Sequence, residues 1–152
     1  MGRCDIGSRS IRVMLVRVDL TLDCSNPARL AEFWRAAAGY VDEPPPAPFS
    51  SREEWLAQYA DEDDDGMDAA WLHDPSGVAP RLSLLQVPEP KIVKNRLHLD
   101  LRVSGQGTPA EKWSHITQEV TRLSSLGAAV VQEFTGHHVV MADPEGNEFC
   151  VA

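Results

Sequence analysis

The sequence predicts an α+β fold of two βαβββ modules in one chain, with curled mixed sheets forming a cleft and helices outside. Two observations predict it. An alternating strand followed by a helix that ends at a glycine occurs twice, about eighty residues apart. Each copy then passes through Asp-Pro-x-Gly, at 74–77 and at 143–146, before an apolar strand. Such repetition indicates units that each need a sibling to bury their apolar face, so we expect function in the cleft they share. The alternative fold is a ferredoxin-like α+β sandwich without an enclosed cleft.

The first module opens with a strand and a helix. Residues 16–23 alternate apolar and polar side chains, which is typical of a half-buried strand. Asn26 is expected to cap a helix that has Pro27 at its first position and ends at Gly39. A second strand is expected to begin at 40–41.

Residues 42–67 form an excursion inserted into the first module. Four prolines break regular structure at its start, and Ser51 then begins a capping box for a short helix. A connection of this length is typical of a functional lid or a partly mobile loop. The acidic run 61–65 lacks the spaced ligands of a calcium loop, so we interpret it as a solvated segment rather than a cation site.

The second module repeats the pattern. Thr108 and Glu111 predict a capping box for a long helix that ends at Gly127. Trp34 and Trp113 lie on apolar helical stripes and are expected in the core. The remaining strands are expected at 67–73, 81–87, 96–103, 129–134, 138–142 and 148–152. Module one therefore spans about 14–88 and module two about 95–152.

Length and composition limit the possible functions. The 152 residues suit one domain over 14–152, after a flexible tail at 1–13, with Met14 as an alternative start. The sequence contains neither a bilayer-length apolar run nor a signal-peptide pattern, so we expect no membrane partner and a cytoplasmic location. Three cysteines without a Cys-x-x-Cys pair agree with a reducing compartment. The net charge of −9 and the lack of a basic stripe argue against nucleic acid.

Both opening strands have one aliphatic face, which we expect to pack on the helices, and one polar face. Asp19 and His98 occupy equivalent positions in the repeat, so we expect them to approach each other across the cleft. A solvated outer face would show the same polarity. The polar faces carry Arg17, Asp19 and Thr21 in one copy and Arg96, His98 and Asp100 in the other.

The sequence resembles the vicinal oxygen chelate superfamily, in its glyoxalase-like or bleomycin-resistance-type branch. The resemblance lies in Asn-Pro-Ala-Arg-Leu-Ala-Glu-Phe-Trp at 26–34, Asn-Arg-Leu-His-Leu-Asp-Leu at 95–101 and Asp-Pro-Glu-Gly-Asn-Glu-Phe-Cys at 143–150. It implies paired βαβββ modules around a cleft. In many members that cleft holds a divalent metal, bound by one side chain from each of four strands.

The resemblance places metal ligands at Asp19, at His98 and at Cys150, where the family commonly has glutamate. The fourth ligand would be Gln86 or Ser83, whose register the sequence leaves open. Such a set suits zinc, with nickel, manganese or iron as further candidates, or no metal at all. In the metal-free alternative, Asp19 and His98 form a hydrogen-bonded or charge-paired couple in a binding pocket.

Other residues are candidates for substrate binding. Arg17 and Arg96 are suited to an anionic substrate, or alternatively pair with nearby acidic residues, and Asp100 lies on the same face. Trp55 and Trp71 are expected to line or cover the pocket.

Three functions are compatible with these residues. The first is a glyoxalase-like enzyme of lyase, isomerase or dioxygenase type, in which a metal polarises vicinal oxygens of a small substrate and Glu148 is the candidate base. The second is a metal-free protein that binds or sequesters a small hydrophobic or cationic molecule, as bleomycin-resistance-type members do; the acidic charge would help to recruit a cation. The third is a partner-binding accessory domain that uses the excursion 42–67. We expect a homodimer because modules of this kind often pair.

Overall fold

The computed structural model describes residues 17–58 and 68–152. The predicted tail 1–13 and the acidic run 61–65 lie outside these residues. Within them, the helices and strands follow in the order β1 (Leu20–Cys24), α1 (Pro27–Ala38), β2 (Val41–Asp42), α2 (Arg52–Leu56), β3 (Ala69–His73), β4 (Leu82–Gln86), β5 (Leu99–Leu101), α3 (Pro109–Ser125), β6 (Ala129–Phe134), β7 (His138–Ala142) and β8 (Glu148–Val151).

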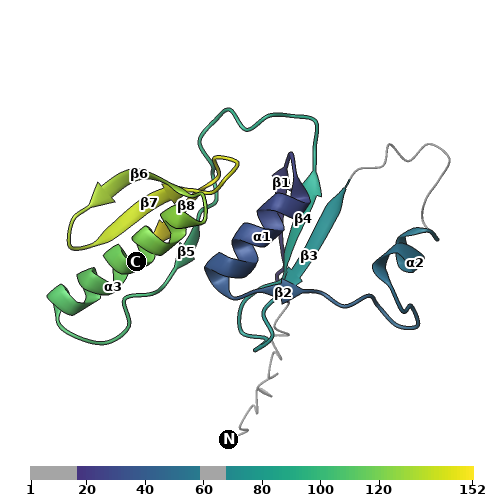
Figure 1. The fold of residues 1–152 in the computed structure, drawn as a ribbon, viewed down its shortest axis with the longest axis horizontal. Helices are drawn as coiled ribbons and strands as arrows, with labels where there is room; N and C mark the ends of the chain where they lie inside the picture. Colours follow the sequence, from purple (N-terminus) through teal and green to yellow (C-terminus); the bar gives the residue numbers. More distant parts are fainter. Residues whose placement is uncertain (1–16, 59–67) are drawn as a thin grey trace, which may run out of the picture.

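The strands form two four-stranded sheets of the same topology (Figure 1). Their orders are β1-β4-β3-β2 and β5-β8-β7-β6. In each sheet the first and last strands of the module pair in parallel, and the other pairs are antiparallel. This duplication confirms the predicted α+β fold of two βαβββ modules. No strand pairing joins the two sheets within the described residues, so the sheets do not close into one.

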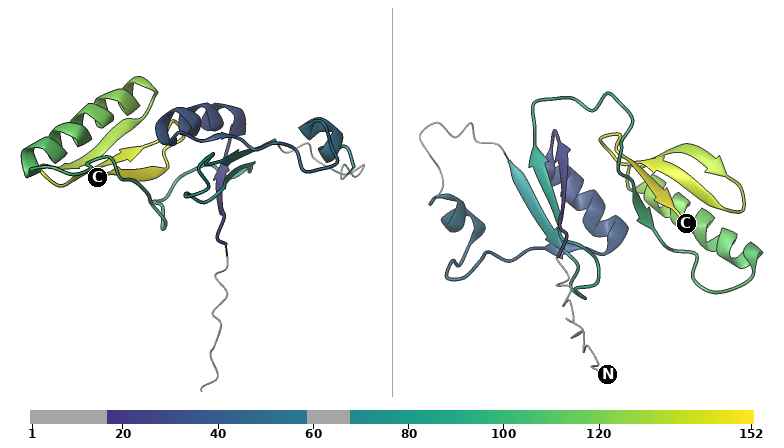
Figure 2. Two further views of the ribbon diagram at one scale, coloured as in Figure 1. Left: turned by 90° about the horizontal axis from the view of Figure 1, so that it is seen from below. Right: turned by 180° about the vertical axis from the view of Figure 1, so that it is seen from behind.

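The long helices begin and end where the local sequence predicts. The Asn26 side chain accepts a hydrogen bond from the N–H of Arg29 at the start of α1, and Gly39 ends that helix with a φ of 72°. A positive φ of this size favours glycine because it has no Cβ. At the start of α3, Thr108 and Glu111 form both hydrogen bonds of a capping box. Figure 2 shows both helices on the same side of the sheets.

The opening strands are shorter than the alternation predicted. Val18 and Leu97 were expected to pack on the helices, but their exposed fractions are 67% and 65%. Both residues precede the first paired residue of their strand, which is Leu20 in β1 and Leu99 in β5. They therefore lie beyond the part of the sheet that the helix covers. Alternation continues past the end of a strand and does not by itself mark that end.

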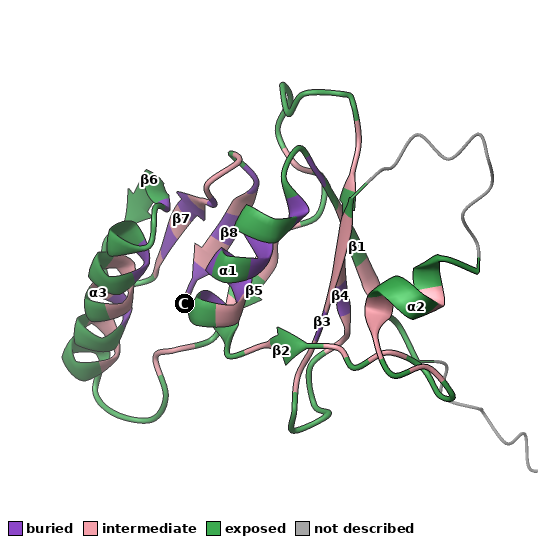
Figure 3. Ribbon diagram, turned by 45° about the vertical axis from the view of Figure 1, so that its right-hand side comes forward, coloured by how far each residue is buried: buried purple, intermediate pink, exposed green. Residues whose placement is uncertain are grey.

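One hydrophobic core runs through both modules, as the buried inner faces in Figure 3 show. Trp34 of α1 is 1% exposed, and its ring centroid lies 5.4 Å from that of Phe33 and 5.5 Å from that of Phe149 in β8. Trp113 is partly buried against the same core. Helix α1 thus packs on its own sheet and on the second module, and this fixes the two modules relative to each other.

The second module also holds both ends of α1. The Glu145 carboxylate accepts hydrogen bonds from the N–H groups of Ser25 and Asn26, at 2.7 and 2.8 Å. Arg122 of α3 donates to two carbonyls in the last turn of α1, at 2.9 and 3.2 Å. A negative group at the start and a positive group at the end of a helix both stabilise its dipole.

The excursion folds in part into α2, at the far end of the first module from the second (Figure 1). Its Arg52 guanidinium lies 5.1 Å from the ring centroid of Trp55 and 4.5 Å from that of Trp71 in β3. These contacts attach α2 to the first sheet. Among the helices of the described residues, none combines the length and the apolar character needed to cross a bilayer.

Candidate ligand site between the modules

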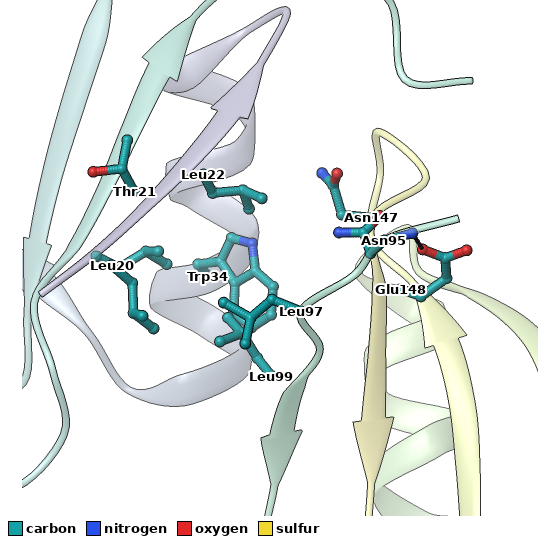
Figure 4. A pocket seen from close by; sticks show the side chains of 10 residues that line it. Leu20, Thr21, Leu22, Trp34, Asn95, Leu97, Leu99, Asn147 and Glu148 are labelled. Carbon is teal, nitrogen blue, oxygen red and sulfur yellow. Dashed lines mark hydrogen bonds between the residues drawn. The ribbon is translucent and has the colours of Figure 1, made fainter. Parts of the chain in front are cut away.

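A cavity of about 130 Å³ lies between the facing edge strands of the two modules (Figure 4). A cavity of about this size, when apolar, accommodates a molecule such as benzene. Helix α1 contributes the Trp34 ring to its wall. The other apolar lining residues are Leu20 and Leu22 of β1, Leu82 of β4, and Leu97 and Leu99 at the start of the second module.

One side of the cavity is polar. Figure 4 shows Asn95, Asn147 and Glu148 gathered there, apart from the leucines of β1. The Asn95 Oδ1 atom is buried and has no hydrogen-bond partner within residues 17–58 and 68–152. The indole N–H of Trp34 is also buried, and its hydrogen bond to the Asp143 carboxylate acts to lower the pKa of that group. Among the residues that the structure describes, the cavity wall therefore contains one unpaired acceptor, the Asn95 side-chain oxygen.

The Asp-Pro-x-Gly turn of the second module positions Asn147. The buried Asp143 carboxylate accepts hydrogen bonds from the N–H groups of Glu145 and Asn147, both at 2.9 Å, and from the Asn147 side chain at 3.0 Å. Burial raises the pKa of this carboxyl, and the hydrogen bonds oppose that rise. In the first module, Asp74 uses the same motif to bind backbone N–H groups, chiefly that of Ala79, which hold its pKa well below the usual range.

Glu148, the predicted base, lines the cavity, but its charge is already balanced. Its carboxylate accepts a hydrogen bond from the Asn95 N–H at 2.7 Å and lies 3.5 Å from the ammonium group of Lys91. The Asn95 N–H, with smaller contributions from neighbouring lysines, lowers the pKa of Glu148. A carboxylate stabilised in this way is a weaker base.

The predicted metal ligands fall into separate contacts. The Asp19 carboxylate accepts a hydrogen bond from Nε of Arg17 at 2.9 Å. In the second module, Lys94 donates to Nε2 of His98 at 3.3 Å, and Nδ1 of His98 lies 3.9 Å from Sγ of Cys150. The structure thus brings His98 and Cys150 together, whereas no hydrogen bond or ion pair joins Asp19 to His98.

The strand register identifies the counterpart of Cys150 in the first module. Leu82 pairs with the first residue of β1, and Phe149 pairs with the first residue of β5. Leu82 and Phe149 are therefore equivalent, and so are the residues that follow them, Ser83 and Cys150. Of the two candidates that the sequence left open, the register favours Ser83 as the equivalent position.

Gln86 lies three residues further along β4 and has other partners. Its side-chain oxygen accepts a hydrogen bond from the Asp68 N–H at 2.9 Å, and its nitrogen donates to the Ser25 carbonyl at 3.3 Å. By alternation it shares the helix-facing side of β4 with Leu82, not the side of Ser83. Its amide ties the end of β4 to the neighbouring loops.

These donors do not fit the four-ligand metal site that the resemblance implies. Within residues 17–58 and 68–152, no three histidine, cysteine, aspartate or glutamate side chains converge closely enough to hold a metal ion. Burial, together with the nearby Asp100 carboxylate, raises the pKa of Cys150, which favours the thiol over the thiolate that binds metals. A serine hydroxyl at position 83 is a weak ligand.

The predicted substrate-binding residues do not line the cavity. Arg17 pairs with Asp19, and Asp100 accepts a hydrogen bond from Arg102 at 2.9 Å. Arg96 is exposed. The guanidinium group of Arg17 therefore pairs with a nearby carboxylate, which was the alternative to binding an anionic substrate. The carboxylate of Asp100 likewise has a local partner of opposite charge.

The sequence did not distinguish the aromatic residues that line the cavity from those that do not. Trp55 and Trp71 pack edge to face against each other, 5.8 Å apart, and lie outside the cavity lining. Trp34, expected in the core, belongs both to the core and to the cavity wall. Sequence reasoning also missed Asn95 and the lining leucines. The signal available for the leucines was the aliphatic face shared by both opening strands.

The fold and the cavity between the two modules define a paired-module protein of the glyoxalase type. The sequence profile of the Glyoxalase-like domain family matches residues 19–152, so the chain belongs to this family and the predicted resemblance is confirmed. Among proteins of curated function, none matches the sequence.

Solved structures share the fold. The chain is similar to the fosfomycin resistance protein FosX from Mesorhizobium loti, with a TM-score of 0.61, 9% identity and 91% of each chain covered. A variant of FosX from Listeria monocytogenes, complexed with Mn(II) and 1S,2S-dihydroxypropylphosphonic acid, gives 0.60, with 11% identity and coverage of 91% of this chain and 92% of that one. A glyoxalase/bleomycin resistance protein/dioxygenase family enzyme from Burkholderia phytofirmans gives 0.54, 13% identity and coverage of 88% and 97%. At these identities the likeness shows the fold alone.

Proposed function

We propose that this protein binds a small, largely apolar organic molecule in the cavity between its modules, and that binding needs no divalent metal. The observation that carries the proposal is the cavity itself, walled by leucines from both modules and by the Trp34 ring. Apolar surface with a few convergent polar groups is typical of small-molecule sites. Among Asp19, His98, Ser83 and Cys150, His98 contacts Cys150 whereas Asp19 pairs with Arg17, and this arrangement supports the metal-independent form of the proposal.

The cavity adjoins a larger open groove along the inter-module linker. The two hollows share the lining residues Thr21, Leu22, Asn95 and Asn147. A ligand larger than one ring would therefore place its apolar part in the cavity and the remainder in the groove. For a probe of seven heavy atoms such as toluene, the ceiling of about 1.5 kcal/mol per heavy atom corresponds to about 10 kcal/mol, so we expect a dissociation constant no tighter than about 20 nM.

Toluene is a suitable first probe because it matches the cavity in size and is apolar. We expect it to shift the indole N–H resonance of Trp34 in the NMR spectrum, with little change at Trp113, which lies outside the cavity. Leu82→Phe should fill the cavity and weaken toluene binding at least tenfold, since Leu82 forms part of its wall. Leu126→Phe is the matched control, because Leu126 is outside the cavity lining.

Two results would contradict the proposal: no toluene binding by the folded parent protein, or unchanged affinity in Leu82→Phe. Leu97→Phe provides a second blocking variant, since Leu97 is at the exposed rim and its replacement places little strain on the core. Binding that is unaffected by a chelator supports metal independence. Binding lost on chelation and restored by zinc, nickel, manganese or iron would refute it.

A glyoxalase-like enzyme acting on vicinal oxygens is the second candidate. The contact between His98 and Cys150 favours it, because it places two potential metal ligands together on the second sheet. The likeness in fold to a FosX variant complexed with Mn(II) also favours it. Stoichiometric metal in protein purified without chelator, lost in His98→Ala, would support this candidate over metal-free binding.

We also propose a homodimer. The edge strand β6 is exposed along its whole length and carries Val130, Val131 and Phe134 on its surface. Exposed apolar edge strands readily pair with another chain. Light scattering should give twice the chain mass, and Val131→Lys should shift it toward the monomer. A monomeric parent protein at micromolar concentration would contradict this proposal.

A further inference from the structure

We infer that the free edge of β1 binds a short extended peptide, one apolar side chain of which enters the inter-module cavity. This inference rests on the proposed binding function and adds the class of ligand and the backbone groups that hold it. It is carried by the hydrogen-bonding pattern of β1 and by the two hollows that border this strand.

Alternate residues of β1 bond to β4. The Leu20 N–H donates to the carbonyl that precedes β4, at 2.8 Å, and the Cys24 carbonyl accepts from the N–H that follows β4, at 2.9 Å. The backbone groups of successive residues in a strand point to opposite edges. The N–H and carbonyl groups of Thr21 and Asp23 therefore face away from β4.

This outer edge of β1 has no partner strand. Within residues 17–58 and 68–152, β1 lies at the end of its sheet, and the backbone groups of Thr21 and Asp23 make no hydrogen bond. Both residues are exposed. Unpaired backbone groups on alternate residues are the pattern to which an extended peptide adds as a further strand.

The free edge borders both hollows. Thr21 lines the cavity and the groove, although its side chain points away from Leu22 and Trp34 (Figure 4). It is therefore the backbone of Thr21 that borders the cavity. The groove, of about 860 Å³, continues along β1 to the end of the strand and is also lined by linker residues 93–95. A chain extended along this edge would occupy both hollows.

Strand geometry defines the peptide motif. Residues directly opposite each other in a strand pair place their side chains on the same face. A peptide residue opposite Leu22 therefore points into the cavity that Leu22 lines, and its two neighbours lie opposite the free backbone groups of Thr21 and Asp23. The cavity of about 130 Å³ suits one side chain of the size of leucine. The minimal ligand is thus one apolar residue between two residues that bind through their backbone.

The groove does not favour an ionic ligand. Its lining contains equal numbers of basic and acidic residues: Arg29, Lys91, Lys94, Asp23, Glu89 and Glu145. Two of them, Glu145 and Lys91, already have partners of their own. An uncharged backbone with one apolar side chain therefore suits this surface better than a charged group.

The test uses the peptide acetyl-Ala-Leu-Ala-amide and amide hydrogen exchange measured by NMR. In the free protein, the amide protons of Thr21 and Asp23 should exchange quickly, whereas that of Leu22, which faces β4, should be protected. At about 90% occupancy, the peptide should slow exchange at Thr21 and Asp23 about tenfold. Acetyl-Ala-Ala-Ala-amide should bind at least about tenfold more weakly, because it leaves the cavity empty.

A pair of variants assigns binding to the backbone. Thr21→Pro removes the N–H that faces the peptide and keeps the hydrogen bonds to β4, so it should weaken peptide binding at least about fivefold. Thr21→Val is the matched control, since it keeps the N–H and the shape of the side chain, and should bind the peptide within about twofold of the parent protein. Toluene, which does not use the edge, should bind both variants within about twofold of the parent protein.

The outcomes distinguish this inference from the proposed function. If neither toluene nor the peptide binds, the binding function itself fails. If toluene binds but the leucine peptide binds no more tightly than the alanine peptide, or leaves exchange at Thr21 unchanged, the inference is overturned while the function stands. Protection of Thr21 that rises with protein concentration would place a second copy at this edge and also overturn it. Equal losses in Thr21→Pro and Thr21→Val would do the same. Because exchange is measured on the parent protein, misfolding of a variant does not remove the test.

Discussion

Replacing Glu145 with alanine should destabilise the protein by about 2 kcal/mol. Its half-buried carboxylate accepts two hydrogen bonds, from the N–H groups of Ser25 and Asn26, just before the first turn of α1. A charge-assisted hydrogen bond in a partly solvated position contributes about 1 kcal/mol, and N-terminal capping substitutions cost about 0.5–2 kcal/mol. Because Glu145 belongs to the second module, its loss also weakens the contact between modules.

For a domain of this length, each kcal/mol corresponds to about 2–4 °C in Tm, so the expected loss is about 4–8 °C. Thermal unfolding by circular dichroism and urea titration measure it. Glu145→Gln keeps one acceptor without the charge and should fall between. Glu89→Ala is the matched control, since it removes one negative charge from the exposed inter-module linker. A Tm for Glu145→Ala within about 1 °C of the parent value would refute the reasoning.

Three further predictions concern other contacts. Arg122→Ala removes two hydrogen bonds to the last turn of α1 and should cost about 1 kcal/mol in urea unfolding, whereas Lys112→Ala on the same helix should cost less. Thr108→Ala breaks the capping box of α3, and should cost about 1 kcal/mol and speed amide exchange at Glu111. Burial raises the pKa of Cys24 to about 11, so the folded state keeps the thiol proton after the unfolded state has lost it. Unfolding free energy should therefore fall between about pH 9 and pH 11, less steeply in Cys24→Ala.

Local signals allowed the helices to be predicted from the sequence. The cap at Asn26, the left-handed Gly39 and the capping box at Thr108 each depend on residues within a few positions of one another. The duplication was also visible, because the two copies repeat the same order of strand, helix and Asp-Pro-x-Gly turn. Short-range physics therefore sufficed for these helices, and the repeat sufficed for the order of elements in each module.

The position of the cavity could not be predicted in the same way. Alternation shows which residues share a face of a strand, but not which face meets the other module. The sequence favoured the polar faces of Asp19 and His98, whereas leucines of the opposite faces line the cavity. The deciding contacts join residues far apart in the chain, such as Trp34 with Phe149 and Glu145 with Ser25.

The cavity lies against one side of the Trp34 ring, and the two repeats differ in the side chain that they place beside this ring. The equivalent positions on the parallel partner strands hold Phe149 in the second module and Leu82 in the first. The Phe149 ring packs against the Trp34 ring, with centroids 5.5 Å apart. Leu82, a smaller side chain, instead forms part of the cavity wall that Trp34 also lines. A protein core normally fills such a volume, because an empty cavity loses packing contacts. The smaller side chain at position 82 therefore leaves space beside Trp34, and this space is the cavity to which we assign ligand binding.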